Sequence, residues 1–178
     1  MGKQIDVHVR LDADTYRRYC NFDAFRRRRK WFTPLMASMC LIAVSMFLLL
    51  RQDRAYTTAA GVLMGLGIAV PMVFFGLYFI QQQAQIVGQG LKGGQPIYSI
   101  RLAEEGIRVT NDRRSEPSVD MDWSGLYAAF RRRGCVYLYV SPERALILPD
   151  GQASVSDAAL WSFILRHMGE NRCNDMTG

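Results

Sequence analysis

The chain has 178 residues and a formal net charge of +6, a balance that first suggests an acidic partner such as a nucleic acid. The positive charge is local, however, because residues 1–30 hold nine Lys and Arg against four Asp and Glu, whereas residues 97–178 hold ten against eleven. A nucleic-acid-binding protein more often carries its positive charge across the folded domain. The charge distribution therefore argues against nucleic acid as a partner.

Residues 1–30 are expected to form a strand followed by a basic amphipathic helix. Residues 4–10 alternate apolar and polar side chains, which is the period of a half-buried strand. A lone strand leaves its backbone groups unpaired, so we predict that this one joins the C-terminal sheet; a disordered tail is the alternative. Asp12 and Thr15 are typical of a helix start, and aromatic residues follow at intervals of about three.

Two long uncharged runs follow a block of five cations. These cations are Arg26, Arg27, Arg28, Arg29 and Lys30. The runs cover residues 31–50 and 55–80, and a helix that rises about 1.5 Å per residue crosses the roughly 30 Å hydrocarbon core of a bilayer within each of them. We therefore predict a two-helix transmembrane hairpin over residues 31–80. A signal peptide fits poorly, because its charged region belongs at the extreme N-terminus and a second run follows here.

The cations also predict the orientation of the hairpin. The positive-inside bias places the N-terminus in the cytoplasm, and a second crossing returns the C-terminus to the same side. The basic block can attract anionic lipid or act only as a topology signal, and the sequence leaves both readings open. Neither run contains Asp, Glu, Lys, Arg or His, which disfavours a channel or transporter acting alone.

Gly61 and Gly65 form a small-xxx-small pair in the second run, a spacing that lets helix backbones approach closely. We expect this pair to pack against the other helix of the hairpin, with Ser45 level with Gly61 and Ser38 level with Gly67. Association with a second copy of the chain through the same glycines is the alternative.

Residues 81–96 are predicted to continue the second helix as a polar extension that breaks down into a Gly-rich linker. The periodicity then changes, and six short strands are expected between residues 97 and 148. Ser154 and Asp157 resemble a capping box at the start of a closing helix, and residues 171–178 are expected to be a tail. The fold class predicted is α+β: a transmembrane hairpin plus a small antiparallel β-barrel or bent-sheet domain, residues 97–170, closed by one C-terminal helix.

Several motifs resemble those of the YcxB-like family of bacterial membrane proteins. In chain order they are Tyr98-Ser-Ile-Arg-Leu-Ala-Glu-Glu-Gly-Ile-Arg-Val, Met121-Asp-Trp-Ser-Gly-Leu, Val136-Tyr-Leu-Tyr-Val and Ala145-Leu-Ile-Leu-Pro. Two adjacent apolar runs behind a short N-terminal segment also match this family. The resemblance implies a pleckstrin-homology-like C-terminal domain and a location in the bacterial inner membrane, and it supplies no catalytic residues.

The sequence contains no constellation of residues that suggests catalysis. His8 and His167 are expected to be structural, and the four cysteines are widely separated, without a CxxC pair. Asp120 and Asp122 are expected on a solvated strand face. We therefore predict a protein that is not an enzyme and that uses no cofactor or metal.

Three consecutive arginines stand at a predicted hairpin tip: Arg131, Arg132 and Arg133. They are candidates for contact with anionic headgroups or an acidic partner, although a solvated turn is the favoured alternative. The sequence predicts a non-enzymatic, membrane-anchored interaction protein that presents its cytoplasmic domain to a protein partner or to the lipid surface. The second hypothesis is an accessory subunit of a transporter or other membrane complex, packed through Gly61 and Gly65.

Overall fold

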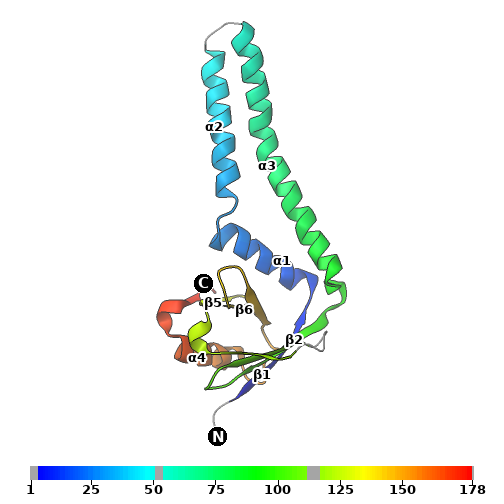
Figure 1. The fold of residues 1–178 in the computed structure, drawn as a ribbon, viewed down its shortest axis with the longest axis vertical. Helices are drawn as coiled ribbons and strands as arrows, with labels where there is room; N and C mark the ends of the chain where they lie inside the picture. Colours follow the sequence, from blue (N-terminus) through cyan, green and yellow to red (C-terminus); the bar gives the residue numbers. More distant parts are fainter. Residues whose placement is uncertain (1–3, 51–53, 112–116, 178) are drawn as a thin grey trace. The chain divides into compact units, whose positions relative to one another are not determined.

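A computed structural model describes residues 4–50, 54–111 and 117–177 of the chain (Figure 1). Most of the segment between the two predicted membrane helices lies outside the described residues, and so do residues 112–116.

The chain divides into two compact units. Residues Met1–Tyr19 and Gly90–Gly178 form a β-rich unit, and residues Cys20–Gln89 form a helical unit. The C-terminal domain predicted from residue 97 is therefore incomplete without the N-terminal residues of the chain.

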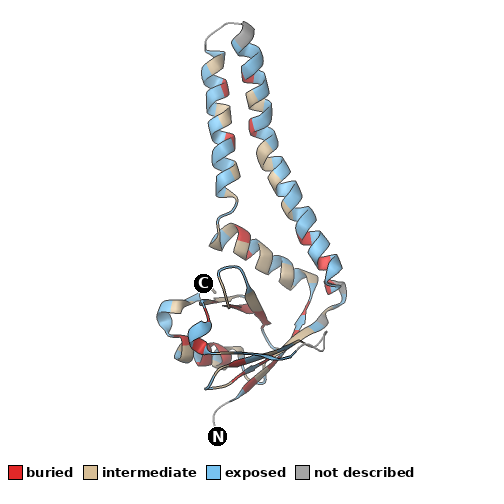
Figure 2. Ribbon diagram, viewed as in Figure 1, coloured by how far each residue is buried: buried red, intermediate tan, exposed pale blue. Residues whose placement is uncertain are grey.

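The helical segments that follow the first strand are α1 (Ala13–Asn21), the π-helical η1 (Phe22–Arg27), α2 (Phe32–Leu49) and α3 (Arg54–Gly88). Asp12 precedes α1 as predicted, and its carboxylate accepts a 2.9 Å hydrogen bond from the backbone N–H of Thr15. Both α2 and α3 are long and apolar enough to cross a membrane, and most of their residues are exposed (Figure 2). The predicted polar extension of the second helix is confirmed, because α3 continues beyond Ile80 to Gly88.

The described strands form two four-stranded sheets. The first sheet has the order β1-β2-β3-β4, made of β1 (Ile5–Leu11), β2 (Gln95–Leu102), β3 (Ile107–Asn111) and β4 (Val119–Met121). The second has the order β7-β6-β5-β8, made of β5 (Ala128–Arg132), β6 (Cys135–Tyr139), β7 (Ala145–Pro149) and β8 (Cys173–Asp175). All neighbouring strands are antiparallel except β5 and β8, which are parallel.

The prediction that residues 4–10 add a strand to the C-terminal sheet is confirmed. Strand β1 pairs with β2 from Ile5 opposite Leu102 to Leu11 opposite Gln95. Its odd-numbered residues are all buried in the core, whereas its even-numbered residues lie on the other face and are half-buried or exposed. The helices are thus an insertion between two strands that pair with each other.

Of the two forms expected for this domain, a barrel or a bent sheet, the barrel is not supported, because the described residues contain no ladder that closes the two sheets into one. Strand β1 instead forms a bridge from Val7 to Ala153, in the segment that follows β7, and a side chain of β2 bonds to β7 itself. The Tyr98 hydroxyl donates a 3.0 Å hydrogen bond to the carbonyl of Ile147 and accepts one of 2.8 Å from its N–H. One side chain therefore satisfies both backbone groups that Ile147, on edge strand β7, directs away from β6.

The closing helix α4 (Asp157–Met168) forms as predicted, although its cap is different. Ser156, not Ser154, is the N-cap residue, and its hydroxyl accepts a hydrogen bond from the N–H of Ala159. Ser154 instead pairs with β1, where its N–H donates to the Asp6 carbonyl at 2.8 Å and its hydroxyl accepts from the Asp6 N–H at 3.1 Å. The predicted tail is also wrong in part, because it contains the short strand β8.

We predict that Tyr98→Phe destabilises the β-rich unit by about 2 kcal/mol, because it leaves a part-buried N–H and carbonyl of Ile147 unpaired. Urea unfolding of the whole chain in detergent, followed by the fluorescence of Trp123 and Trp161, measures the change. Tyr56→Phe on the helical unit is the control, and we expect it to leave the urea midpoint of the β-rich unit unchanged. Equal unfolding midpoints for Tyr98→Phe and the unmodified chain would contradict the role of the hydroxyl.

Candidate functional site

The helical path breaks at the block of five cations. The π-helical segment η1 ends with a hydrogen bond of 2.9 Å from the Arg28 N–H to the Asp23 carbonyl. Arg29 then adopts a left-handed backbone conformation with φ of 48°, and its carbonyl accepts the N–H of Phe32 at 2.9 Å as α2 begins. A non-glycine residue in this region is uncommon, so the break is a specific feature of the segment.

The structure separates the five cations into two groups. Asp23 forms ion pairs with Arg27 at 3.0 Å and with Arg28 at 2.9 Å, and the side chains of these residues are mostly buried. Arg26, Arg29 and Lys30 are exposed, and none of them forms an ion pair within the described part of the chain. Two cations thus stabilise the segment that carries them, while three remain free to meet something outside it.

Aromatic and polar contacts fix η1 against α3. The Phe25 ring lies 5.2 Å from the Tyr78 ring and 6.0 Å from the Phe75 ring. Asn21 accepts a 2.9 Å hydrogen bond from the Tyr78 hydroxyl, and the indole N–H of Trp31 donates to the Phe25 carbonyl at 2.9 Å. The cations therefore lie beside aromatic residues with polar ends, a residue type that is typical of the border between membrane and water.

Two serines hold α2 and α3 together. The Ser38 hydroxyl donates to the Gly67 carbonyl at 2.5 Å, and the Ser45 hydroxyl donates to the Ala60 carbonyl at 2.7 Å. Both serines are buried. The two serines are seven residues apart on α2, and the residues that they contact are seven apart on α3, which is the repeat of left-handed helix packing. The predicted alignment of Ser38 with Gly67 is confirmed, whereas Ser45 meets Ala60 and not Gly61.

The expected contact of Gly61 and Gly65 within the hairpin is wrong. A Cβ atom at either position would meet nothing within 4 Å. A Cβ atom at Gly67 would lie 2.8 Å from Ile42 Cγ1 and 3.3 Å from the Ser38 carbonyl oxygen. The close approach of the two helices therefore depends on Gly67, and the small-xxx-small pair lies on an open face.

The arginines at the β5–β6 hairpin contact the C-terminal residues of the chain. Arg131 forms an ion pair of 3.5 Å with Asp175, and the Arg133 side chain donates to the Thr177 carbonyl at 3.3 Å. These contacts arise because β8 pairs with β5. Strand β8 is only three residues long, too short for an alternating pattern to predict it from the sequence. The cluster Arg131, Arg132 and Arg133 is therefore not the free hairpin tip that was expected.

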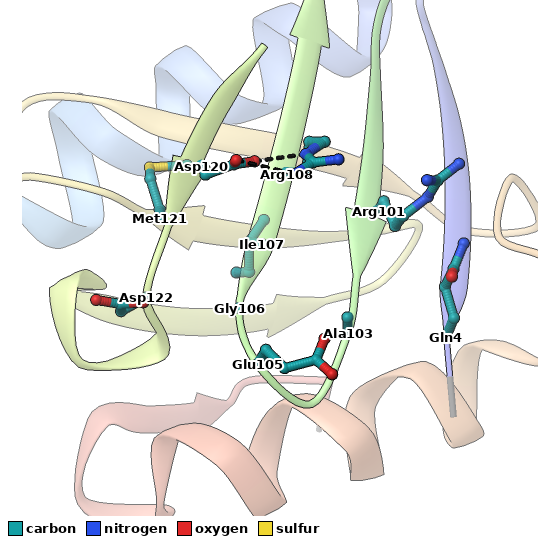
Figure 3. Close-up of a pocket in the computed structure, with 10 residues that line it drawn as sticks. All are labelled: Gln4, Arg101, Ala103, Glu105, Gly106, Ile107, Arg108, Asp120, Met121 and Asp122. Atoms are coloured by element: carbon teal, nitrogen blue, oxygen red, sulfur yellow. Dashed lines mark hydrogen bonds and ion pairs between the residues drawn. The ribbon is translucent and has the colours of Figure 1, made fainter. Parts of the chain in front are cut away.

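A polar groove crosses the outer face of the first sheet (Figure 3). Its volume is about 370 Å³, and Arg101, Arg108 and Asp120 contribute to its wall. The strand register places Asp6 opposite Arg101, Arg101 opposite Arg108, and Arg108 opposite Asp120. Four charges thus form a row across all four strands, with the two arginines in the middle.

Each arginine of this row is paired with the acid beside it. Arg108 binds Asp120 through two hydrogen bonds of 2.6 and 2.9 Å, and Arg101 binds Asp6 at 3.0 Å. These hydrogen bonds lower the pKa of both carboxyl groups below the ordinary value and raise the pKa of Arg108. Asp120 was expected on a solvated strand face, but the arginines beside it were not predicted, because the strand register that brings them together is a tertiary property.

A histidine and a serine lie close together on the same sheet, outside the lining of the groove. His8 and Ser99 come closest to a base and nucleophile, with His8 Nδ1 and Ser99 Oγ 3.1 Å apart. The His8 ring is exposed, and no other hydrogen bond orients it among the described residues. The described residues likewise contain no group of three or more His, Cys, Asp or Glu that could hold a metal ion.

The chain matches no protein-family model, no curated protein and no solved structure.

We predict that Gly67→Val separates α2 from α3 and lowers the thermal stability of the helical unit in detergent, because its side chain collides with Ile42 and the Ser38 backbone. Gly61→Val makes the same change on the same helix in open space, so it controls for helix propensity. Melting followed by circular dichroism compares the two variants. A Gly61→Val variant that melts as early as Gly67→Val would refute this packing.

Proposed function

We propose that the protein is a non-enzymatic, membrane-anchored interaction protein of the bacterial inner membrane. The α2–α3 hairpin is its anchor, and the β-rich unit is the part that meets a protein partner or the lipid surface. The observation that carries the proposal is the pairing of β1 with β2 on either side of the hairpin in the chain.

This pairing supports an even number of membrane crossings. Leu11 and Gln95 are opposite each other in the sheet, and every helix from α1 to α3 lies between them in the chain. A single crossing separates the two strands by a bilayer, whereas two crossings return the chain to the same side. The two apolar helices supply that number. A signal peptide in the first apolar run also fits poorly with this pairing, because its cleavage would remove β1 from the sheet.

The exposed cations support a cytoplasmic position for both termini. Arg26, Arg29 and Lys30 directly precede α2, and positively charged residues beside a spanning helix remain on the cytoplasmic side. With two crossings the β-rich unit lies on that same side. All four cysteines are free thiols in the structure, as suits a reducing compartment.

The β-rich unit is proposed to be a pleckstrin-homology-like domain, as the resemblance to the YcxB-like family implies. Its seven antiparallel strands, β1 to β7, followed by the closing helix α4, support this proposal. The polar groove of the first sheet offers paired charges to a partner, and the described residues hold no catalytic constellation. Such a surface suits recognition of another protein better than chemistry.

The open face of α3 favours a second candidate function, that of an accessory subunit in a larger membrane complex. Gly61 and Gly65 lie on this face with nothing within 4 Å, so another helix can approach them closely. Purification in mild detergent followed by mass spectrometry separates the two candidates. A stable large membrane partner that is lost with Gly61→Val and Gly65→Val favours the accessory subunit, and soluble partners or a lone protein favour the interaction protein.

We predict that a cysteine at position 52, in the charged segment between the two apolar runs, reacts with an impermeant maleimide added to intact spheroplasts, and that a cysteine at Asp122 reacts only after the membrane is opened. The Asp122 side chain is exposed, so the side of the bilayer on which it lies decides the result. The background is a variant in which the four natural cysteines are replaced by serine or alanine. Labelling of position 122 in sealed spheroplasts would overturn the proposed topology.

A further inference from the structure

We infer that Arg26, Arg29 and Lys30 form a binding site for the phosphate headgroup of an anionic phospholipid, distinct in role from the neighbouring Arg27 and Arg28. The inference rests on the proposed insertion of the hairpin in a membrane and goes beyond it by naming a ligand and its residues. It replaces a uniform basic block with two groups of cations that act differently.

Asp23 makes this division. Its carboxylate is shared by Arg27 and Arg28, at 3.0 and 2.9 Å, and its side chain is only 15% exposed. Charges that are paired in this way add little further attraction toward a distant anion. The exposed group of Arg26, Arg29 and Lys30 carries three positive charges without a paired acid in the described residues. An external anion is the natural partner of these three side chains.

The backbone at Arg29 keeps two members of the group outside the helices. Its left-handed conformation, with φ of 48°, ends the helical path of η1 before α2 starts at Phe32. A continuous helix places successive residues on all sides of its axis, so part of the block would turn inward. At the break, both Arg29 and Lys30 are exposed.

The residues that follow identify the ligand as a lipid. Phe32, Leu35 and Met36 are 53%, 38% and 42% exposed, and they come immediately after the cations on α2. A nucleic acid or an acidic protein offers no apolar phase for these side chains. A phospholipid supplies both parts, a phosphate for the cations and acyl chains for the apolar surface.

The aromatic contacts place the cations at headgroup depth. Trp31 is bonded to the Phe25 carbonyl, and the Phe25 ring packs against Tyr78. Tyr78 in turn binds Asn21, and the polar run of α3 begins at Gln81, one turn further along the helix. Tryptophan and tyrosine favour the interface between acyl chains and water, and the guanidinium fork fits a phosphate diester.

The test measures how lipids with short chains stabilise the full-length protein in a neutral detergent. Dioctanoyl phosphatidylglycerol is the anionic probe, and dioctanoyl phosphatidylcholine is the neutral one. We expect phosphatidylglycerol to raise the melting temperature with a higher apparent affinity than phosphatidylcholine. In the Arg26→Gln/Arg29→Gln/Lys30→Gln variant, the apparent affinity for phosphatidylglycerol falls on the order of a hundredfold, toward that of phosphatidylcholine.

Two further variants separate lipid binding from folding. Arg27→Gln/Arg28→Gln melts earlier, because it breaks the pairs with Asp23, and it keeps the preference for phosphatidylglycerol over phosphatidylcholine. Arg26→Lys/Arg29→Lys keeps all the charges and retains most of the preference. Loss of the preference in Arg27→Gln/Arg28→Gln, or its survival in the triple variant, overturns the inference.

Two additional measurements isolate the inference from the proposal on which it rests. Inorganic phosphate and glycerol 3-phosphate are expected to leave the melting temperature unchanged, and a shift as large as that of phosphatidylglycerol overturns the lipid as the ligand. Alkaline carbonate extraction of cell membranes tests the anchor separately. If the protein stays in the extracted membranes but shows no lipid preference, the result contradicts the lipid site alone. Release of the protein into the supernatant contradicts the proposed anchor.

Discussion

Strand β1 pairs with β2 along its whole length, and the two strands meet only if the chain returns to its starting point after the helices. This requirement places Leu11 opposite Gln95 and makes the helical segments an insertion within the sheet. The core of the β-rich unit relies on the same pairing, because Ile5, Val7 and Val9 are buried in it. The proposed membrane anchor must therefore cross the bilayer an even number of times, a requirement that the sheet imposes independently of charge.

Ion pairs determine which of these charged residues are available to partners. Asp23 forms ion pairs with Arg27 and Arg28, and the acids of the first sheet form ion pairs with Arg101 and Arg108. The row of charges across that sheet is electrically balanced, so it offers specificity more than long-range attraction. The cations left exposed before α2 remain available to an anionic surface.

Local patterns in the sequence predicted the individual elements well. Alternation identified β1, and the two apolar runs identified α2 and α3. Features that depend on register or on contacts distant in the chain were missed or wrong, including the pairing of β8 with β5 and the role of Gly67 in place of Gly61. The sequence shows which residues are small, but the rotation of one helix against its neighbour is a tertiary property, and it decides which of them make contact.

A disulfide between β1 and β2, formed in native membranes, tests whether these two strands pair across the helical insertion. His8 and Ser99 are opposite each other, and the N–H of His8 bonds to the Gln152 carbonyl and not to β2, so this pair belongs to the closer, non-hydrogen-bonded type. Cysteines at both positions, in a chain without its natural cysteines and with a protease site at residue 52, are oxidised in membrane vesicles and then cleaved. The account predicts fragments that stay linked until reduced. Fragments that separate without reduction, from protein that remains in the membrane, would contradict it.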